Sequence, residues 1–429
     1  MLFLLPRYPV ACTGERLAMS RTDYVRQSPI GEPRAPRARF TSNKKHRRRA
    51  RNRRIRRIVA LVLLGPLIWL SFSVGGALLN PSLGSSAGSR LAEWARTHGG
   101  SGIVNWVENE WYSHHPPKVG GTVPPGAIVK TSGPGAVSSS VPHLATPNPI
   151  APFASPALPG EGKWSPVGRP VDGIPALYET TLRPDAIHTS YVVGVAWMDT
   201  KLLHATLYSG SLIPGGGPYT YSAPIKPQAA RTLVAAFNAG FLMANAQGGY
   251  YTDHKVVMPL RTGAASFVVY KDGTSDIVAW PSTRGVPSNV SSVRQNLDLL
   301  VRNGHEVSGL QANDTSKWGF TLGNAVYVWR SGLGVTADGA LVYVGGPGLN
   351  ITDLANLLVR AGAVRAMELD INTDWVNFSS YRPATATGLA TAANGALLLT
   401  AMSGSTSRYF ETWCGRDFIT MSANITGKN

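Results

Sequence analysis

One stretch of the chain is both long enough and apolar enough to cross a membrane. Residues 58–79 contain no charged side chain, and the segment 44–57 directly before them is dominated by Lys and Arg. At 1.5 Å per residue the apolar run spans about 33 Å as a helix, which matches a hydrocarbon core of about 30 Å. The pattern therefore predicts a single transmembrane helix over residues 58–79.

Positive charge flanks this run on one side only, because the next charged residue after it is Arg90. Basic flanks stay in the cytoplasm, so residues 1–57 are predicted to be a cytoplasmic tail and the rest of the chain to be extracytoplasmic. A cleaved signal peptide is the alternative, since Ser85 to Gly88 offers small residues. The apolar run exceeds the roughly 7–15 residues of a signal peptide's apolar region, which favours a retained anchor in the cell membrane.

Residues 80–160 are predicted to connect the anchor to a folded domain. The stretch 91–112 has helical periodicity and three tryptophans, which is typical of a helix at the membrane surface or at the start of a stalk. From 113 to 160 the chain is rich in Pro, Gly and Ser and nearly free of charge. This composition predicts an extended linker, so we expect residues 161–429 to fold by themselves.

Residues 161–429 contain short apolar runs of the β-strand type, punctuated by Gly and Pro. Strands are predicted at 191–197, 202–208, 233–238, 265–270, 276–280 and 325–329. Asp-Gly turns at 271–274 and 336–339 predict two hairpins. A helix is predicted after Asn350, a polar cap followed by Asp353 in the first turn. The fold class is therefore α+β, mostly antiparallel sheets with flanking helices, preceded by the transmembrane helix.

A net charge of +17 would suggest nucleic-acid binding if it lay on the folded domain. It does not, because most of it lies in the N-terminal tail. Residues 1–57 hold 17 of the 41 Lys and Arg and only three acids, while the remainder holds 24 basic and 21 acidic residues. The domain is thus nearly neutral, and a nucleic-acid partner is not expected. The two cysteines, Cys12 and Cys414, would lie on opposite sides of the membrane, so no disulfide is expected and Cys414 is predicted to be a buried thiol.

Three separated segments carry the chemistry of the domain. The first, Phe237–Phe241, ends an apolar strand with Asn238 and a glycine. The second, Arg330–Gly339, has an arginine followed by a glycine-rich strand and an Asp-Gly turn, and the third, Leu349–Asp370, gives a helix, a glycine and a strand that ends in Met-Glu-Leu-Asp. In this order and spacing they resemble the phosphodiester glycosidase family. Where that family has Leu-Asp-Gly-Gly-Gly-Ser, this chain has Leu369-Asp-Ile-Asn-Thr-Asp374, which keeps the aspartate but not the glycines.

The resemblance implies a glycosidase acting on sugar phosphodiesters, with Asp370 as a catalytic residue, and Glu368 is predicted to be the second catalytic carboxylate. Alternation of apolar and polar residues sets Glu368, Asp370 and Asn372 on one face of a strand, with backbones of successive members about 6.5–7 Å apart. Glycosyl transfer requires two neighbouring carboxylates, one to stabilise the cationic sugar and one to move a proton. An ordinary solvated strand face is the alternative interpretation.

Substrate-binding candidates surround these carboxylates in the sequence. Arg330 can bind two phosphate oxygens with its planar guanidinium, although a surface ion pair is the alternative. The other candidates share a polar side chain near a motif or in a polar loop: Asn238, Thr336, Asn372, Asp374 and Tyr250. No cofactor is expected, and the histidine and cysteine spacing predicts no metal site.

Taken together, the sequence predicts a membrane-anchored extracytoplasmic enzyme. Its expected substrate is a sugar-1-phosphodiester, or a related glycosidic bond, in an envelope glycan or phosphopolymer. A non-catalytic domain that binds or anchors cell-envelope glycan is the alternative, since the glycine loop of the family motif is absent.

Overall fold

The computed structural model describes residues 43–84, 86–100, 103–104, 118–128, 140–282, 285–314, 317–319 and 326–424. Its described helices are α1 (Asn43–Leu79), α2 (Ala87–Thr97), α4 (Pro227–Ala230) and α5 (Ile351–Arg360), with short 3-10 turns at Pro81–Leu83, Ala392–Asn394 and Arg408–Phe410. Most of the remaining regular structure is β-strand, and the described strands pair only in antiparallel fashion. The predicted α+β class is confirmed.

The strands form three sheets. The eight-stranded sheet has the order β1 (Ser165–Val167), β2 (Leu177–Leu182), β3 (Val193–Met198), β14 (Leu341–Leu349), β13 (Val328–Thr336), β15 (Ala363–Glu368), β11 (Leu299–Arg302) and β12 (His305–Glu306). One five-stranded sheet has the order β7 (Lys255–Met258), β6 (Tyr250–Thr252), β10 (Val290–Gln295), β8 (Ala265–Tyr270) and β9 (Ser275–Ala279). The other has the order β17 (Gly395–Leu397), β16 (Phe378–Tyr381), β5 (Leu233–Asn238), β18 (Phe418–Ala423) and β4 (Leu203–Tyr208).

The N-terminal helix α1 agrees with the predicted membrane span. Its segment Arg47–Leu79 is long and apolar enough to cross a membrane, judged by length and composition. The helix predicted over residues 91–112 differs, because α2 ends at Thr97 with His98 as its C-cap, followed by Gly99 and Gly100. Gly99 has φ +83° and the Gly100 amide donates to the Ala95 carbonyl, a left-handed ending that glycine permits at little cost. Residues 105–112 lie outside the described residues.

The predicted hairpins and the predicted helix are all present. Turn 271–274 joins β8 to β9, and turn 336–339 joins β13 to β14 with Gly339 at φ +93°. The Asn350 side chain accepts the Asp353 amide at 2.8 Å, while the Asp353 carboxylate accepts the Asn350 amide at 3.2 Å. This reciprocal capping starts α5 at the residue expected from the sequence. Of the predicted strand 325–329, residue 325 lies outside the described residues and β13 begins at Val328.

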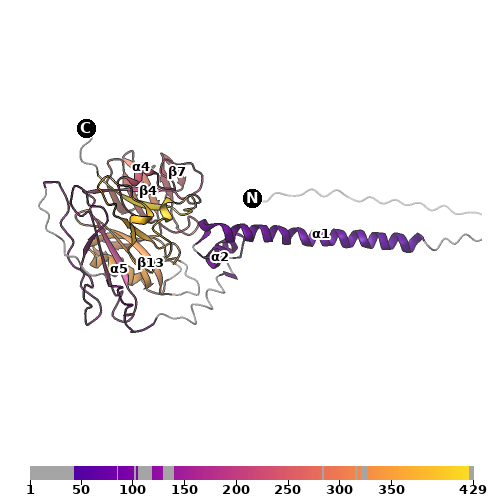
Figure 1. Ribbon diagram of the computed structural model, residues 1–429, viewed down its shortest axis with the longest axis horizontal. Coiled ribbons are helices and arrows are strands. Elements are labelled where there is room, and N and C mark those ends of the chain that lie inside the picture. The colour runs from indigo at the N-terminus through magenta and orange to yellow at the C-terminus, as the bar shows by residue number, and fades with distance from the viewer. Residues whose placement is uncertain are drawn as a thin grey trace, which may run out of the picture. The chain divides into compact units, whose positions relative to one another are not determined.

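The eight-stranded sheet is buried on both faces. One face packs on α5, which lies beside β13 (Figure 1). There Leu354, Leu357 and Leu358 belong to an apolar cluster that includes Val342 and Ala366. A strand covered on both faces has a continuous run of apolar residues, and Leu341 to Val344 of β14 form such a run.

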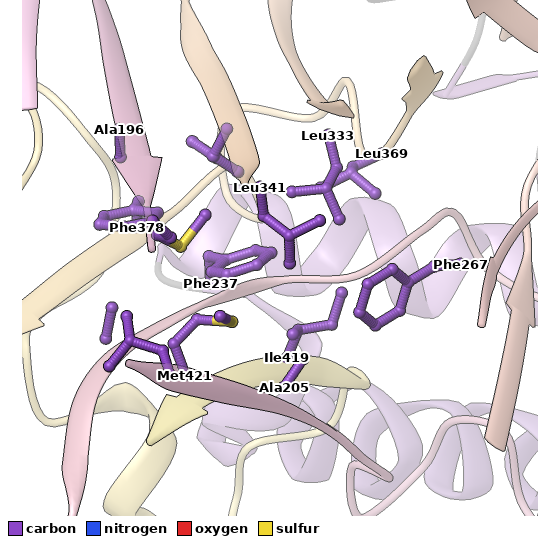
Figure 2. Close-up of a cluster of buried hydrophobic side chains, with 14 of the residues drawn as sticks. Ala196, Ala205, Phe237, Phe267, Leu333, Leu341, Leu369, Phe378, Ile419 and Met421 are labelled. Carbon is purple, nitrogen blue, oxygen red and sulfur yellow. The ribbon is translucent and has the colours of Figure 1, made fainter. Parts of the chain in front are cut away.

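The other face of this sheet packs on the two five-stranded sheets. Figure 2 shows Phe237 of β5 lying among Leu341, Phe378 and Met421. The Phe237 ring stacks on Phe378 with centroids 5.5 Å apart. This packing holds the end of β5, where Asn238 lies, against β13 and β14 of the eight-stranded sheet.

Residues 144–162, most of them predicted as linker, pack along the domain in the structure. The Leu144 amide donates to Asp199 Oδ2 at 2.8 Å, and the Ile150 amide donates to the Gly162 carbonyl at 2.9 Å. The buried Arg183 pairs with Glu161 at 2.8 Å and also donates to the carbonyls of Ala154 and Pro156. Where the independently folding unit begins stays a prediction, but these contacts favour a start before residue 144.

We expect a fragment 140–429 to be more stable than a fragment 161–429. The shorter fragment lacks Ala154 and Pro156, so the Arg183 guanidinium loses two hydrogen bonds in a buried site. Hydrogen bonds to charged groups contribute roughly 1.5–3 kcal/mol each, so the loss should be at least about 3 kcal/mol. For a domain of this size, thermal melts should differ by roughly 6–12 °C. Equal melting temperatures would show that residues 144–160 contribute nothing to the fold.

Candidate active site

The three motif segments meet at the hydroxyl group of Ser331. Asn238 at the end of β5 donates from Nδ2 to Ser331 Oγ at 3.0 Å. Ser331 Oγ donates to the carbonyl of Asp370 at 2.9 Å and accepts the Asp370 amide at 3.1 Å. The structure therefore brings the sequence-predicted Asn238 and Asp370 together, through a serine that the sequence did not single out.

The Asn238 side chain has its hydrogen-bonding groups occupied. Its Oδ1 accepts from Tyr343 Oη at 2.9 Å and from the Asn377 amide at 3.1 Å, and its Nδ2 also donates to the Ala239 carbonyl. An amide with two donors and one two-lone-pair acceptor is saturated by four such bonds. Asn238 thus holds two sheets together at the edge of the site.

Arg330 and Glu368 form a buried ion pair. Arg330 Nη1 lies 2.5 Å from Glu368 Oε1, and the two side chains are 1% and 0% exposed. Arg330 also donates to the carbonyls of Leu349 and Trp318 at 3.1 Å. Burial raises the pKa of Glu368 to about 7, opposed by the charge of Arg330. The polar face of this strand end is therefore not solvated, and this arrangement leaves no Arg330 surface open to a ligand.

Asp370 has a different environment from Glu368. Its Oδ1 accepts the Asn372 amide at 3.0 Å, and its Oδ2 lies 3.9 Å from Arg416 Nη1. Burial raises the pKa of Asp370, while the charge of Arg416 lowers it. The separation exceeds hydrogen-bonding distance, so Asp370 and Arg416 face each other without a direct bond.

Arg416 retains hydrogen-bonding capacity. Its Nη1 is buried and has no hydrogen-bond partner among the described residues. The guanidinium lies over the ring of Trp375 at 4.6 Å, and Arg408 lies over the same ring at 5.3 Å. Two cations on one indole form a positively charged, aromatic surface.

A small pocket opens beside these groups. The residues that line it come from three segments of the chain, and they are Asn238, Trp375, Arg408, Tyr409, Trp413, Cys414, Arg416 and Asp417. Cys414 is buried as predicted, and burial raises the pKa of its thiol to about 12, which makes a thiolate nucleophile unfavourable.

A second buried ion pair lies below the pocket. Arg294 Nε donates to Asp417 Oδ2 at 2.6 Å, and Arg294 also donates to the carbonyls of Gln295 and Phe241. A Cβ atom on Gly240 would lie only 3.0 Å from the Arg294 guanidinium carbon and 2.9 Å from Asn296 Oδ1. The glycine of the first motif therefore allows close approach of the chain to this pair.

The remaining sequence candidates lie elsewhere or are enclosed. Thr336 pairs with Ala363, six residues along β13 from Arg330, or roughly 20 Å away, and its hydroxyl donates to Asp338. Tyr250 is fully buried in the core, with its hydroxyl 3.2 Å from Ser209 Oγ. Asn372 Oδ1 accepts the Asp374 amide at 2.8 Å, so both residues shape the turn after Asp370.

Sequence reasoning missed most of the pocket. The pair Arg416-Asp417 directly precedes the buried strand β18, and a charged pair beside an apolar strand was a usable signal. Trp375 and Arg408 carried no such signal, because only packing brings their side chains together. Among the described residues, no group of three or more His, Cys, Asp or Glu side chains could hold a metal ion.

Several solved structures contain chains with limited similarity to this one. Solved structures with similar chains include the catalytic domain of zebrafish N-acetylglucosamine-1-phosphodiester alpha-N-acetylglucosaminidase, auto-inhibited by its pro-peptide, at 14% identity and TM-score 0.37, over 61% of this chain and 90% of that one. A hypothetical protein from Synechocystis matches at 13% identity and TM-score 0.30, over 61% and 64% of the two chains. A putative exported protein from Burkholderia pseudomallei matches at 12% identity and TM-score 0.24, over 54% and 74%.

No curated protein matches the chain significantly. The family model for phosphodiester glycosidase matches residues 231–370, a range that contains all three motif segments and ends at Asp370. Residues 231–370 are thus a phosphodiester glycosidase domain, a domain of the hydrolase class.

Proposed function

We propose that the chain is a membrane-anchored enzyme that hydrolyses a sugar-1-phosphodiester of an extracytoplasmic glycan or phosphopolymer. One observation carries the proposal: the Asp370 carboxylate faces a guanidinium nitrogen of Arg416 that has no hydrogen-bond partner among the described residues, beside a pocket. A carboxylate beside an unsatisfied arginine suits a substrate whose reacting carbon becomes cationic and whose leaving group is a phosphate.

In the proposed reaction, water adds to the anomeric carbon and the bond from that carbon to the phosphate oxygen breaks. The products are the free sugar and a phosphate monoester, and the proton released from water passes to a base. The Asp370 carboxylate stabilises the cationic sugar centre. Arg416 binds the phosphate, and because a phosphate is a weakly basic leaving group, it needs less help from a general acid than an alcohol would.

Arg330 and Glu368 have supporting roles in this proposal. Both are enclosed, so neither contacts the substrate directly. Their pair fixes the end of β15, and with it the position of Asp370, two residues beyond Glu368. Asn238 also has a supporting role, because its side chain bonds to Ser331 of β13 and Tyr343 of β14 and so joins β5 to the eight-stranded sheet.

Replacement of Asp370 by Asn keeps the shape of the side chain and removes its charge. We expect turnover of a synthetic N-acetylglucosamine 1-phosphodiester to fall at least about 100-fold, with little change in melting temperature. Asp298→Asn, an exposed aspartate paired with Arg261, is the matched control and should keep full turnover. Equal turnover of wild type and Asp370→Asn would reject the proposed site, and binding without turnover in wild type would favour the glycan-binding alternative.

The pH dependence follows from the same carboxyl group. Burial raises the pKa of Asp370, so on acidification the group gains its proton at a higher pH than a free aspartate does. If the ionised form is the active one, turnover should decline toward acid through this raised pKa. A pH–rate profile measures it, and an acid limb no higher than that of free aspartate would contradict the assignment.

Arg416 and Arg330 should respond differently to loss of their charge. Arg416→Met should raise KM for the phosphodiester roughly 10- to 100-fold, since one charge-assisted bond contributes about 1.5–3 kcal/mol. Arg330→Met should mainly destabilise the fold, by roughly 3–5 kcal/mol, because Glu368 is left buried without its partner. Steady-state kinetics and thermal melts of both variants separate the roles. A raised KM in Arg330→Met at unchanged stability would instead assign substrate binding to Arg330.

The membrane topology is part of the proposal, supported by the apolar span of α1 and the basic residues on one flank of it. A phosphatase fused after Asn429 should be active, because this reporter works only on the outer side of the membrane. Activity of a cytoplasmic reporter at the same position would overturn the orientation.

A further inference from the structure

The wall of the candidate pocket contacts the residues that directly follow the apolar helix. Ser82 and Gly415 both belong to the compact unit Ile68–Asn429. A Cβ atom on Gly415 would lie 2.9 Å from the Ser82 carbonyl oxygen and 3.3 Å from Ser82 Cβ, and Ser82 is buried. The neighbours of Gly415 on either side, Cys414 and Arg416, line the pocket. Since α1 ends at Leu79, three residues before Ser82, the residue that contacts the pocket wall lies within about 10 Å of the helix end.

The last turns of α1 have the features of a membrane–water interface. The Trp94 indole of α2 donates to Ser73 Oγ at 2.9 Å, and Trp69 lies 6.0 Å from the His98 ring. Arg90 donates to the carbonyls of Leu78 and Gly84, which satisfies backbone oxygens at the helix end. Tryptophan and arginine side chains are typical of the headgroup level. Because the apolar run that spans the core ends at Leu79, the headgroup level lies near that residue, and Ser82 beside the pocket wall is within about 10 Å of it.

An uncharged loop flanks the same wall. Residues 209–225 contain no charged side chain. The amide of Ser211 donates to the Cys414 carbonyl, and the amides of Leu212 and Ile213 donate to the Gly415 carbonyl. Within this loop Leu212 is 49% exposed and Tyr221 is 45% exposed. The loop has a charged neighbour, Asp253, whose carboxylate accepts the Thr220 amide at 2.7 Å. Its exposed apolar and tyrosine side chains suit contact with lipid headgroups.

From these contacts we infer that the pocket is held close to the bilayer and that its substrate is membrane-borne: a lipid-linked glycan whose sugar-1-phosphodiester stands a few sugars above the headgroups. This inference rests on the proposed function and adds the substrate class to it. Contact of Ser82 with Gly415 fixes the height of the pocket, and the loop 209–225 faces the lipid surface beside it. A substrate confined to the same surface then reaches the pocket at a high effective concentration.

The test uses the full chain in phosphatidylcholine vesicles that contain anionic phosphatidylglycerol. Two probes carry the same N-acetylglucosamine 1-phosphodiester, one soluble as its methyl diester and one joined to a lipid through a short oligosaccharide. A flexible twelve-residue Gly-Ser insertion between Leu79 and Asn80 separates the pocket from the helix end. The same insertion after Ser132, within the proline- and glycine-rich stretch, lengthens the chain without separating Leu79 from Ser82.

We expect the insertion after Leu79 to reduce cleavage of the lipid probe at least about tenfold, with cleavage of the soluble probe unchanged within about twofold. The insertion after Ser132 should leave both rates unchanged. Leu212→Asp should also reduce cleavage of the lipid probe selectively, whereas Leu389→Asp, at an exposed leucine outside the loop, should not. Cleavage of both probes with no effect of the Leu79 insertion overturns the inference and leaves the proposed function intact. Cleavage of neither probe by wild type overturns the proposed function itself.

Discussion

The site depends on one hydrogen-bonded hydroxyl group, that of Ser331. It accepts from Asn238 and from the Asp370 amide, and it donates to the Asp370 carbonyl. These bonds join strands of two different sheets, so the first, second and third motif segments share one point of attachment. Because a buried polar group without a partner is costly, loss of the Ser331 hydroxyl would leave groups of both Asn238 and Asp370 without this partner. Asp370 is positioned by this network and not by its own strand alone, since β15 ends at Glu368.

Two buried ion pairs flank this point, and they determine which charges remain open to a ligand. Arg330 is neutralised by Glu368, and Arg294 by Asp417. Each pair leaves one carboxylate oxygen, Glu368 Oε2 and Asp417 Oδ1, without a hydrogen-bond partner among the described residues. A buried pair contributes little net stability but is costly to break, so it acts mainly to hold geometry. With these charges matched, the more exposed Arg416 faces the pocket beside Asp370.

The same wall that presents Arg416 also contacts the chain beyond the apolar helix. Gly415 is small enough for the Ser82 backbone to approach it, and its carbonyl anchors the uncharged loop through Leu212 and Ile213. A side chain at Gly415 would displace the Ser82 backbone, the uncharged loop, or both. One short segment, Cys414 to Asp417, therefore couples the candidate chemistry on one side to the anchor-proximal residues on the other.

The sequence by itself determined the elements and the family. Apolar runs, Asp-Gly turns and the capping pattern at Asn350 are local, so they located β5 and β8, the two hairpins and the start of α5, and the three motif segments identified the phosphodiester glycosidase domain. Tertiary structure decided what each polar side chain does. Period-two alternation set Glu368 and Asp370 on one face but could not reveal that Arg330 encloses the first while Arg416, 46 residues beyond the second, faces it. Ion pairing and burial depend on strands that are distant in the sequence and adjacent only after folding, and no local pattern encodes them.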